Sequence, residues 1–342
     1  MSTPTVVAAP DGSSVVAPAV LVAVDASDEI GMGHLMRSLA VVEELVERGR
    51  PVEVLVPRHA PGWGRDRLEH TGAKVITWTG GTSQLAERAV AAGLLVVDLP
   101  TEDLDRLPLA ELEARAPTVV LDDEGGVRPV SAVSTSHPLG DELPWDTTPS
   151  TRRLVGVGHC LLRRAVRDQR PSAPSVPPQS AAIVLGGADV ARLADRLAGA
   201  LLDRDAIDVT VVAADADMAV RLAELDRSGR LHLVPGGGEP APLLAAADLV
   251  VCTASTVMWE ACSMGRVVAT VPVVPGQVPF GRLAVDAGAV ALLDPGDPTT
   301  DLHALLDDHE RCCAIARSAR ALIDGRGVER LADAIDELGG HR

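Results

Sequence analysis

Aromatic side chains are nearly absent from this chain of 342 residues. It contains no tyrosine, one phenylalanine and four tryptophans. Its core must therefore be built mainly from aliphatic residues, and apolar residues as a whole make up 46% of the sequence. The five cysteines are odd in number, which argues against a disulfide framework, and they form no CxxC pair. We expect reduced thiols and no zinc site.

The chain also lacks a net positive charge and long apolar runs. No window reaches the roughly 18 apolar residues that a membrane span needs. Residues 1–17 have neither the basic start nor the apolar centre of a signal peptide, so we predict a flexible tail and a cytoplasmic protein. The net charge of −17 argues against nucleic acid as the partner. A small anion is still compatible, because local N–H groups can bind it.

The most informative stretch of the sequence is 21–45. An apolar run and a polar turn are followed by Gly31, Gly33 and His34, and apolar residues then recur at helical spacing. This order predicts a strand, a glycine turn that can approach a ligand, and a helix. At a helix start the dipole favours a neutral imidazole, which can accept a proton. Arg37 shares the helix face of His34, so we predict both as catalytic residues.

Short apolar runs alternate with helical patterns along the whole chain. The predicted strands are 52–56, 74–78, 94–97, 118–121, one from 181, 207–212, 231–234, 249–252, 267–271 and 289–292. This alternation predicts parallel sheets covered by helices on both faces. Four prolines within 168–179 indicate a stiff linker. We therefore predict an N-terminal domain at 18–167, a linker at 168–180 and a C-terminal domain at 181–342.

A second group of candidate residues follows the predicted strand 249–252. Thr253, Ser255 and Thr256 precede a helix that carries Glu260 about one turn in. Small hydroxylated residues at a helix start offer N–H and O–H donors to phosphate. A glutamate there can accept hydrogen bonds from two ribose hydroxyls. Taken alone, the simpler interpretation is a capped helix with a solvent-exposed glutamate.

The two stretches together resemble a known family. The string D-x-S-x-x-I-G-x-G-H-x-x-R-S-L-A and the later T-A-S-T-x-M-W-E resemble motifs of the PseG/SpsG family of UDP-sugar hydrolases and spore-coat polysaccharide relatives. The resemblance covers roughly residues 20 to 290. Together with the repeated strand and helix order, it implies a GT-B-like α/β fold. In that fold two doubly wound, Rossmann-like domains enclose an inter-domain ligand cleft.

The resemblance also assigns roles to individual residues. It makes His34 the catalytic base, Thr256 a phosphate ligand and Glu260 the ribose ligand. Gly186 and Gly187 resemble the family's second glycine turn.

Other positions depart from the family pattern or leave its meaning open. Asp123 lies where the family often carries an acidic pair, although carboxylates that cap a turn are the simpler interpretation. Ala254 and Ser255 replace a Gly-Gly pair. Gly276 and Gln277 replace Asn-Gln, so we retain Gln277 as a candidate ligand. His159 replaces a tyrosine of the family's G-x-x-Y-x-L-L-R segment.

The resemblance implies an inverting hydrolase that releases UDP when water attacks the anomeric carbon. It implies no metal and no cofactor, with a UDP-sugar as the partner. The missing asparagine favours an alternative in which an acceptor replaces water, as in a glycosyltransferase. A third possibility is a protein that binds nucleotide sugars without turnover.

Overall fold

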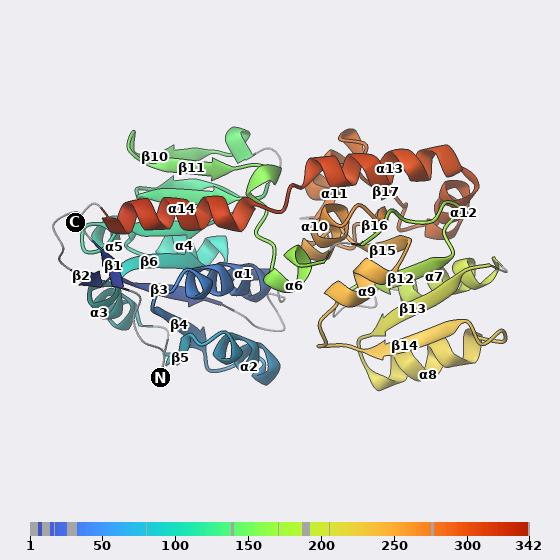
Figure 1. The fold of residues 1–342 in the computed structure, drawn as a ribbon, viewed down its shortest axis with the longest axis horizontal. Coiled ribbons are helices and arrows are strands. Elements are labelled where there is room, and N and C mark those ends of the chain that lie inside the picture. The colour runs from blue at the N-terminus through green and yellow to red at the C-terminus, as the bar shows by residue number, and fades with distance from the viewer. Residues whose placement is uncertain are drawn as a thin grey trace. The chain divides into compact units, whose positions relative to one another are not determined.

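The computed structural model describes residues 6–8, 14–16, 18–25, 33–79, 81–137, 140–169, 171–186, 192–204, 206–274 and 277–340. The chain divides into two compact units, each built around a parallel β-sheet (Figure 1). Unit 1 comprises Met1–Arg164 together with Gly325–Arg342, and unit 2 comprises Ala165–Asp324.

Unit 1 contains a seven-stranded sheet in the order β11-β9-β7-β6-β3-β4-β5, with all neighbours parallel. Its strands are β3 (Ala19–Val24), β4 (Val52–Pro57), β5 (Lys74–Trp78), β6 (Gly93–Asp98), β7 (Thr118–Leu121), β9 (Ala132–Thr135) and β11 (Arg152–Val155). Its helices are α1 (Gly33–Glu47), α2 (Gly62–His70), α3 (Thr82–Ala92), α4 (Thr101–Arg106), α5 (Leu109–Glu113) and α14 (Gly327–Gly340), with the short turns η1 (Gly140–Glu142) and η2 (Val157–His159). A parallel pair, β8 (Gly126–Arg128) with β10 (Trp145–Thr147), and an antiparallel pair, β1 (Val6–Ala8) with β2 (Ser14–Val16), lie outside this sheet.

Helices cover both faces of this sheet. Because side chains alternate along a strand, Val20 and Val22 join one apolar cluster and Leu21 and Ala23 join another. The first cluster includes α1 and α14, which lie side by side in Figure 1, and the second includes α3, α4 and α5. The strands are therefore buried on both faces, as the continuous apolar runs predict.

Unit 2 contains a six-stranded sheet in the order β14-β13-β12-β15-β16-β17, again with all neighbours parallel. Its strands are β12 (Ser180–Val184), β13 (Asp208–Ala213), β14 (Leu231–Pro235), β15 (Leu249–Thr253), β16 (Val267–Val271) and β17 (Ala291–Leu292). Its helices are α7 (Leu193–Leu202), α8 (Ala216–Leu225), α9 (Ala241–Ala246), α10 (Thr256–Ser263), α11 (Val278–Asp286), α12 (Pro298–Asp307) and α13 (His309–Leu322), and α6 (Arg164–Arg167) lies at the unit boundary. One face of the sheet packs against α7, α8, α12 and α13.

The two sheets have the same connectivity. In each sheet, the next two strands of the chain lie on one side of the first strand, and all later strands lie on its other side. The order reverses beside the first strand, between β3 and β6 in unit 1 and between β12 and β15 in unit 2. Open α/β sheets bind ligands at such switch points, outside the carboxyl ends of the strands.

Most predicted strands of the sheets are confirmed, but the connections differ. The connection between β6 and β7 forms two helices, α4 and α5, because Pro108 lacks an N–H group and cannot continue α4. No strand is predicted between residues 121 and 181, yet this stretch supplies β9 and β11 to the main sheet. The sequence pattern does not predict helix α2, because its glycines and charged residues leave too few apolar residues at helical spacing.

The predicted C-terminal domain extends too far, because the last residues of the chain belong to unit 1. Helix α14 belongs to unit 1, not to the domain 181–342. The apolar stripe of α14, which includes Leu331 and Ile335, completes the cluster on α1. Arg48 at the end of α1 adds ion pairs to Asp333 and Asp336. Within the predicted tail, Val6–Ala8 and Ser14–Val16 pair as strands.

Candidate functional site

The two predicted catalytic residues lie on α1 at the switch point of unit 1. Strands β3 and β6 are neighbours, and Val24 at the end of β3 is paired with Asp98 at the end of β6. Helix α1 begins at Gly33, so its first turns carry His34 and Arg37. The connectivity of the sheet therefore brings these side chains to the carboxyl end of β6.

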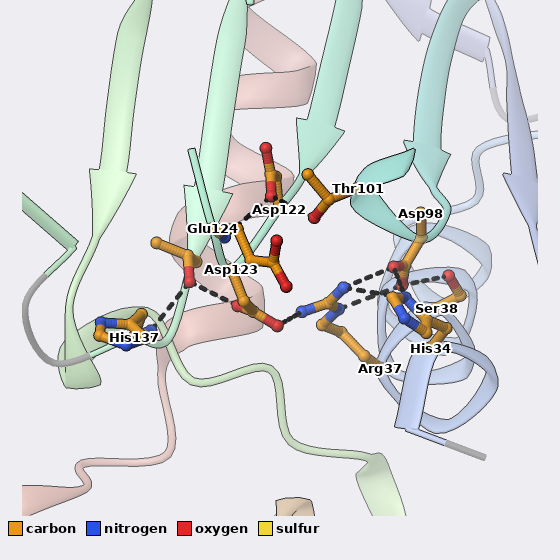
Figure 2. A network of polar contacts seen from close by, with 10 residues as sticks. His34, Arg37, Ser38, Asp98, Thr101, Asp122, Asp123, Glu124 and His137 are labelled. Carbon is orange, nitrogen blue, oxygen red and sulfur yellow. Dashed lines mark hydrogen bonds and ion pairs between the residues drawn. The ribbon is translucent and has the colours of Figure 1, made fainter. Parts of the chain in front are cut away.

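His34 and Asp98 form a hydrogen-bonded pair (Figure 2). The distance from His34 Nδ1 to Asp98 Oδ1 is 2.6 Å. The imidazole is 23% exposed, whereas the carboxylate is fully buried. One edge of the ring is thus held from inside the protein while part of the ring remains open to a ligand.

Asp98 is kept ionised by the groups around it. Burial alone would raise the pKa of this carboxyl, but the charges of Arg37 and His34 and their hydrogen bonds hold the pKa at about 2. The hydroxyl of Ser38 donates a further bond to Oδ2 over 2.9 Å. Asp98 is therefore a carboxylate at neutral pH, able to accept hydrogen bonds and unable to donate them.

The charge of Asp98 fixes the tautomer of His34. Two acceptors cannot share a hydrogen bond of 2.6 Å, so Nδ1 must carry the proton. Arg37 Nη2 also lies 3.2 Å from Nδ1, but a guanidinium only donates, and it donates to the same Asp98 oxygen over 2.5 Å. In the neutral ring Nε2 is then an acceptor, and no residue in the described ranges hydrogen-bonds to it. This nitrogen is the candidate base.

Arg37 is buried between two carboxylates. Its Nε and Nη2 donate to Asp98, and its Nη1 donates to Asp123 over 2.5 Å. Burial opposes the charge, but the two carboxylates outweigh it and raise the pKa of Arg37. Its cation is thus already balanced inside the network, which makes Arg37 a group that positions Asp98 and Asp123.

The adjacent Asp122 and Asp123 have different surroundings at the end of β7. Asp122 is fully buried and accepts a bond from Arg128 Nε over 2.8 Å, which is a structural ion pair. Asp123 is 32% exposed and accepts bonds from Arg37 and from the Thr135 hydroxyl. Only Asp123 is therefore connected to the His34 network while still reaching solvent (Figure 2). Nearby, burial lowers the pKa of His137.

The predicted phosphate ligands of unit 2 lie at its own switch point. Gly186 follows β12 with a positive φ of 75°, and Thr253 ends the neighbouring strand β15. Ser255 is the N-cap of α10, yet its side chain makes no capping bond. Its hydroxyl instead accepts a bond from the Thr253 hydroxyl over 3.2 Å. Thr256 is the first residue of the helix, so hydroxyls and N–H groups converge at this edge.

The other two predicted ligands of unit 2 have different surroundings. Glu260 is only 4% exposed, so it is not the solvent-exposed glutamate of the simpler interpretation. Its charge lies near the Cys252 thiol, whose pKa is raised to about 12 by burial first and by Glu260 second. Gln277 caps α11, and its side-chain oxygen accepts a bond from the Val273 N–H.

Three glycines of the sequence motifs, Gly31, Gly187 and Gly276, fall outside the described residues. Gly33 is the first residue of α1, and a Cβ placed there would meet nothing within 4 Å. The described part of the chain contains no group of three His, Cys, Asp or Glu residues that could hold a metal ion. It also contains no helix long and apolar enough to span a bilayer.

Asp98 and Ser38 are the site residues that sequence reasoning missed. Asp98 directly ends an apolar strand, and its neighbour in the sheet leads into the glycine turn. A polar residue at the end of the strand beside the glycine turn is the signal that could have revealed it. That signal requires the strand order, which a single sequence does not give.

Comparison with solved structures shows the fold. MurG from Acinetobacter baumannii matches with a TM-score of 0.67 and 15% identity, covering 94% of this chain and 100% of that one. A UDP co-structure of S. aureus MnaA matches with a TM-score of 0.64 and 11% identity, covering 94% and 96%. The calicheamicin glycosyltransferase CalG4 matches with a TM-score of 0.62 and 14% identity, covering 95% and 99%. The chain has the GT-B fold.

Comparison with curated sequences gives a local match. A UDP-N-acetylglucosamine--N-acetylmuramyl-(pentapeptide) pyrophosphoryl-undecaprenol N-acetylglucosamine transferase from a Nocardioides species is 38% identical over 104 residues. The matched segment spans 28% of this chain and 28% of that relative. No family model matches the chain, so the PseG/SpsG resemblance stays a prediction.

Proposed function

We propose that this protein is a glycosyltransferase that uses a UDP-sugar as donor. The observation that carries the proposal is the His34–Asp98 pair, which engages Nδ1 and leaves His34 Nε2 without a hydrogen-bond partner among the described residues. The donor class is supported by the local relative, an N-acetylglucosamine transferase, and by MnaA, whose structure contains UDP.

In the proposed reaction His34 acts as the general base. Nε2 takes the proton of an acceptor hydroxyl while the hydroxyl oxygen attacks the anomeric carbon. The bond from that carbon to UDP breaks, and UDP leaves with the electron pair, inverting the configuration. Asp98 stabilises the imidazolium that forms, because its carboxylate already accepts the Nδ1 proton. Arg37 and Ser38 position Asp98, and Asp123 positions Arg37.

Unit 2 is proposed to bind the nucleotide. Gly186 and the residues Thr253, Ser255 and Thr256 supply backbone and hydroxyl donors for the diphosphate. The N-terminus of α10 adds a favourable dipole, which also stabilises a leaving phosphate without a metal ion. Glu260 remains the proposed ribose ligand, and Gln277 a proposed ligand at the same edge. The PseG/SpsG resemblance supports these assignments.

Hydrolysis is the second candidate function. The string that includes His34 resembles a hydrolase motif, and water can replace the acceptor at the same base. Binding without turnover is a third candidate, and it gives the His34–Asp98 pair no chemical role.

Nucleotide release from a panel of UDP-, dTDP- and CDP-sugars distinguishes these functions. Release that requires a candidate acceptor supports transfer, whereas release in water alone supports hydrolysis. We expect His34→Ala to lower turnover by about 10²-fold or more with UDP affinity nearly unchanged. His70→Ala is the matched control, because this exposed histidine on α2 bonds only locally, to the Asp66 carbonyl. Normal turnover of His34→Ala would refute the assignment of the base.

A further inference from the structure

A second histidine and aspartate face each other at the carboxyl edge of unit 1. Asp25 directly follows β3, and its N–H donates to the Asp98 carbonyl over 3.1 Å. His59 follows the neighbouring strand β4. Asp25 begins the glycine-turn motif of the sequence, yet the proposed mechanism gives it no task. Both residues lie where parallel strands end and ligands bind.

The two side chains approach without forming a hydrogen bond. His59 Nε2 lies 3.6 Å from Asp25 Oδ1, beyond hydrogen-bond range. Asp25 is 16% exposed, and its Oδ1 is a buried atom that accepts no hydrogen bond from the residues the structure describes. His59 is 63% exposed. A buried carboxylate oxygen without a donor is costly, so this position requires a donor from elsewhere.

We infer that Asp25 and His59 form a hydroxyl-binding position for an uncharged, hydroxyl-rich sugar moiety. A hydroxyl can donate to Asp25 Oδ1 and at the same time interact with His59 Nε2. It can do so with either imidazole tautomer, because it both donates and accepts. An ammonium only donates, so it would match Asp25 together with just one of the two His59 tautomers. A hydroxyl therefore matches both groups.

The charges around this position separate a sugar from an anion. Asp98, whose backbone carbonyl accepts the Asp25 N–H, has an ionised carboxylate that disfavours a phosphate. Arg58, which is exposed and adjacent to His59, is the group that could instead attract one. Free sugar and inorganic phosphate are therefore the two probes that test the inference.

The experiment follows the histidine side-chain nitrogens of the full-length protein by ¹⁵N NMR. N-acetylglucosamine and inorganic phosphate are titrated separately. We expect N-acetylglucosamine to shift the His59 signals and to bind about tenfold or more weakly in Asp25→Asn, which weakens the acceptor at constant shape. Asp66→Asn on α2 is the matched control and should bind like the wild type. Circular dichroism and thermal unfolding verify that each variant is folded.

Three results would overturn the inference. They are no response of His59 to the sugar, equal binding by Asp25→Asn, and a stronger response to phosphate than to sugar. If Asp25→Asn does not fold, His59→Phe removes the other partner, and unchanged sugar binding by that variant would also refute it. The inference rests on the proposed sugar chemistry of unit 1, but its readout needs no turnover. A sugar response without nucleotide release would contradict the proposed reaction alone.

Discussion

The two units share a strand order but differ in the chemistry of their switch points. In unit 1 the edge carries His34, Asp98, Arg37 and Asp123, whose charges are interlocked by direct hydrogen bonds. In unit 2 the corresponding edge carries a glycine turn and hydroxyl side chains. One fold thus presents a network of ionisable side chains in one unit and neutral hydrogen-bond donors in the other. The chemistry resides in the residues that follow the strands, not in the sheet.

The difference also concerns how each edge is held in place. The side chains of unit 1 are fixed by two ion pairs of Arg37 at 2.5 Å and by the His34–Asp98 hydrogen bond at 2.6 Å, so removing Arg37 leaves a buried carboxylate without its partner. The hydroxyls of unit 2 interact through a longer neutral bond, and the backbone supplies part of the donor set. Substitutions at the edge of unit 1 should therefore change stability and turnover more than substitutions at the edge of unit 2 change UDP affinity.

The largest effect is expected for Arg37→Met. This substitution keeps the volume but leaves Asp98 ionised and buried without its cation, so the free energy of unfolding should fall by about 3–5 kcal/mol. Urea unfolding measures it. Arg58→Met, at an exposed arginine, is the control and should change stability by less than about 0.5 kcal/mol. Equal effects of the two substitutions would mean that the network does not stabilise unit 1.

Asp98→Asn should lower turnover by about 10²-fold or more. The amide has the shape of the carboxylate, but it neither fixes the Nδ1 proton nor stabilises the imidazolium. The drop should appear in kcat more than in KM, and UDP affinity, which we assign to unit 2, should not change. A variant that lost UDP affinity and retained kcat would contradict the division of roles between the units.

The sequence predicted the two sheets and three of the four residues of this network, namely His34, Arg37 and Asp123. Alternating apolar runs identify buried parallel strands, and the glycine turn identifies His34 and Arg37. Asp98 and Ser38 were missed because their roles depend on β6 lying beside β3, a contact between residues about 60 positions apart. Helix α14 was misassigned because periodicity reveals an apolar stripe but not the unit that it covers.

The stability of the protein should fall in acid in a way that depends on Asp98. Its pKa is about 2 when folded and 3.8 ordinarily, so below about pH 5 the unfolded chain takes up protons before the folded one does. The contribution of Asp98, about 2 kcal/mol, is fully present above that range and is lost as the pH falls towards 2. Thermal unfolding between pH 6 and pH 3 should show a flatter profile for Asp98→Asn. Parallel profiles would contradict the assigned pKa.

The smallest effect is expected in unit 2, for Thr256→Val. This substitution removes one hydroxyl at the start of α10 and retains the branched shape and the backbone N–H groups. UDP affinity measured by calorimetry should fall by about tenfold or less, because backbone donors and other hydroxyls remain. Thr300→Val near the start of α12 provides a control outside the proposed site. If the UDP affinity did not fall, the Thr256 hydroxyl would not be a phosphate ligand.

The tautomer of His34 is the most direct test of the central claim, which is that Asp98 fixes the proton on Nδ1 and leaves Nε2 as the base. Long-range ¹H–¹⁵N spectra of ¹⁵N-histidine-labelled protein, assigned with His34→Ala, distinguish the two nitrogens without any ligand. We predict the Nδ1–H tautomer in the wild type and its loss in Asp98→Asn. A neutral His34 that carries its proton on Nε2 in the wild type would contradict the account.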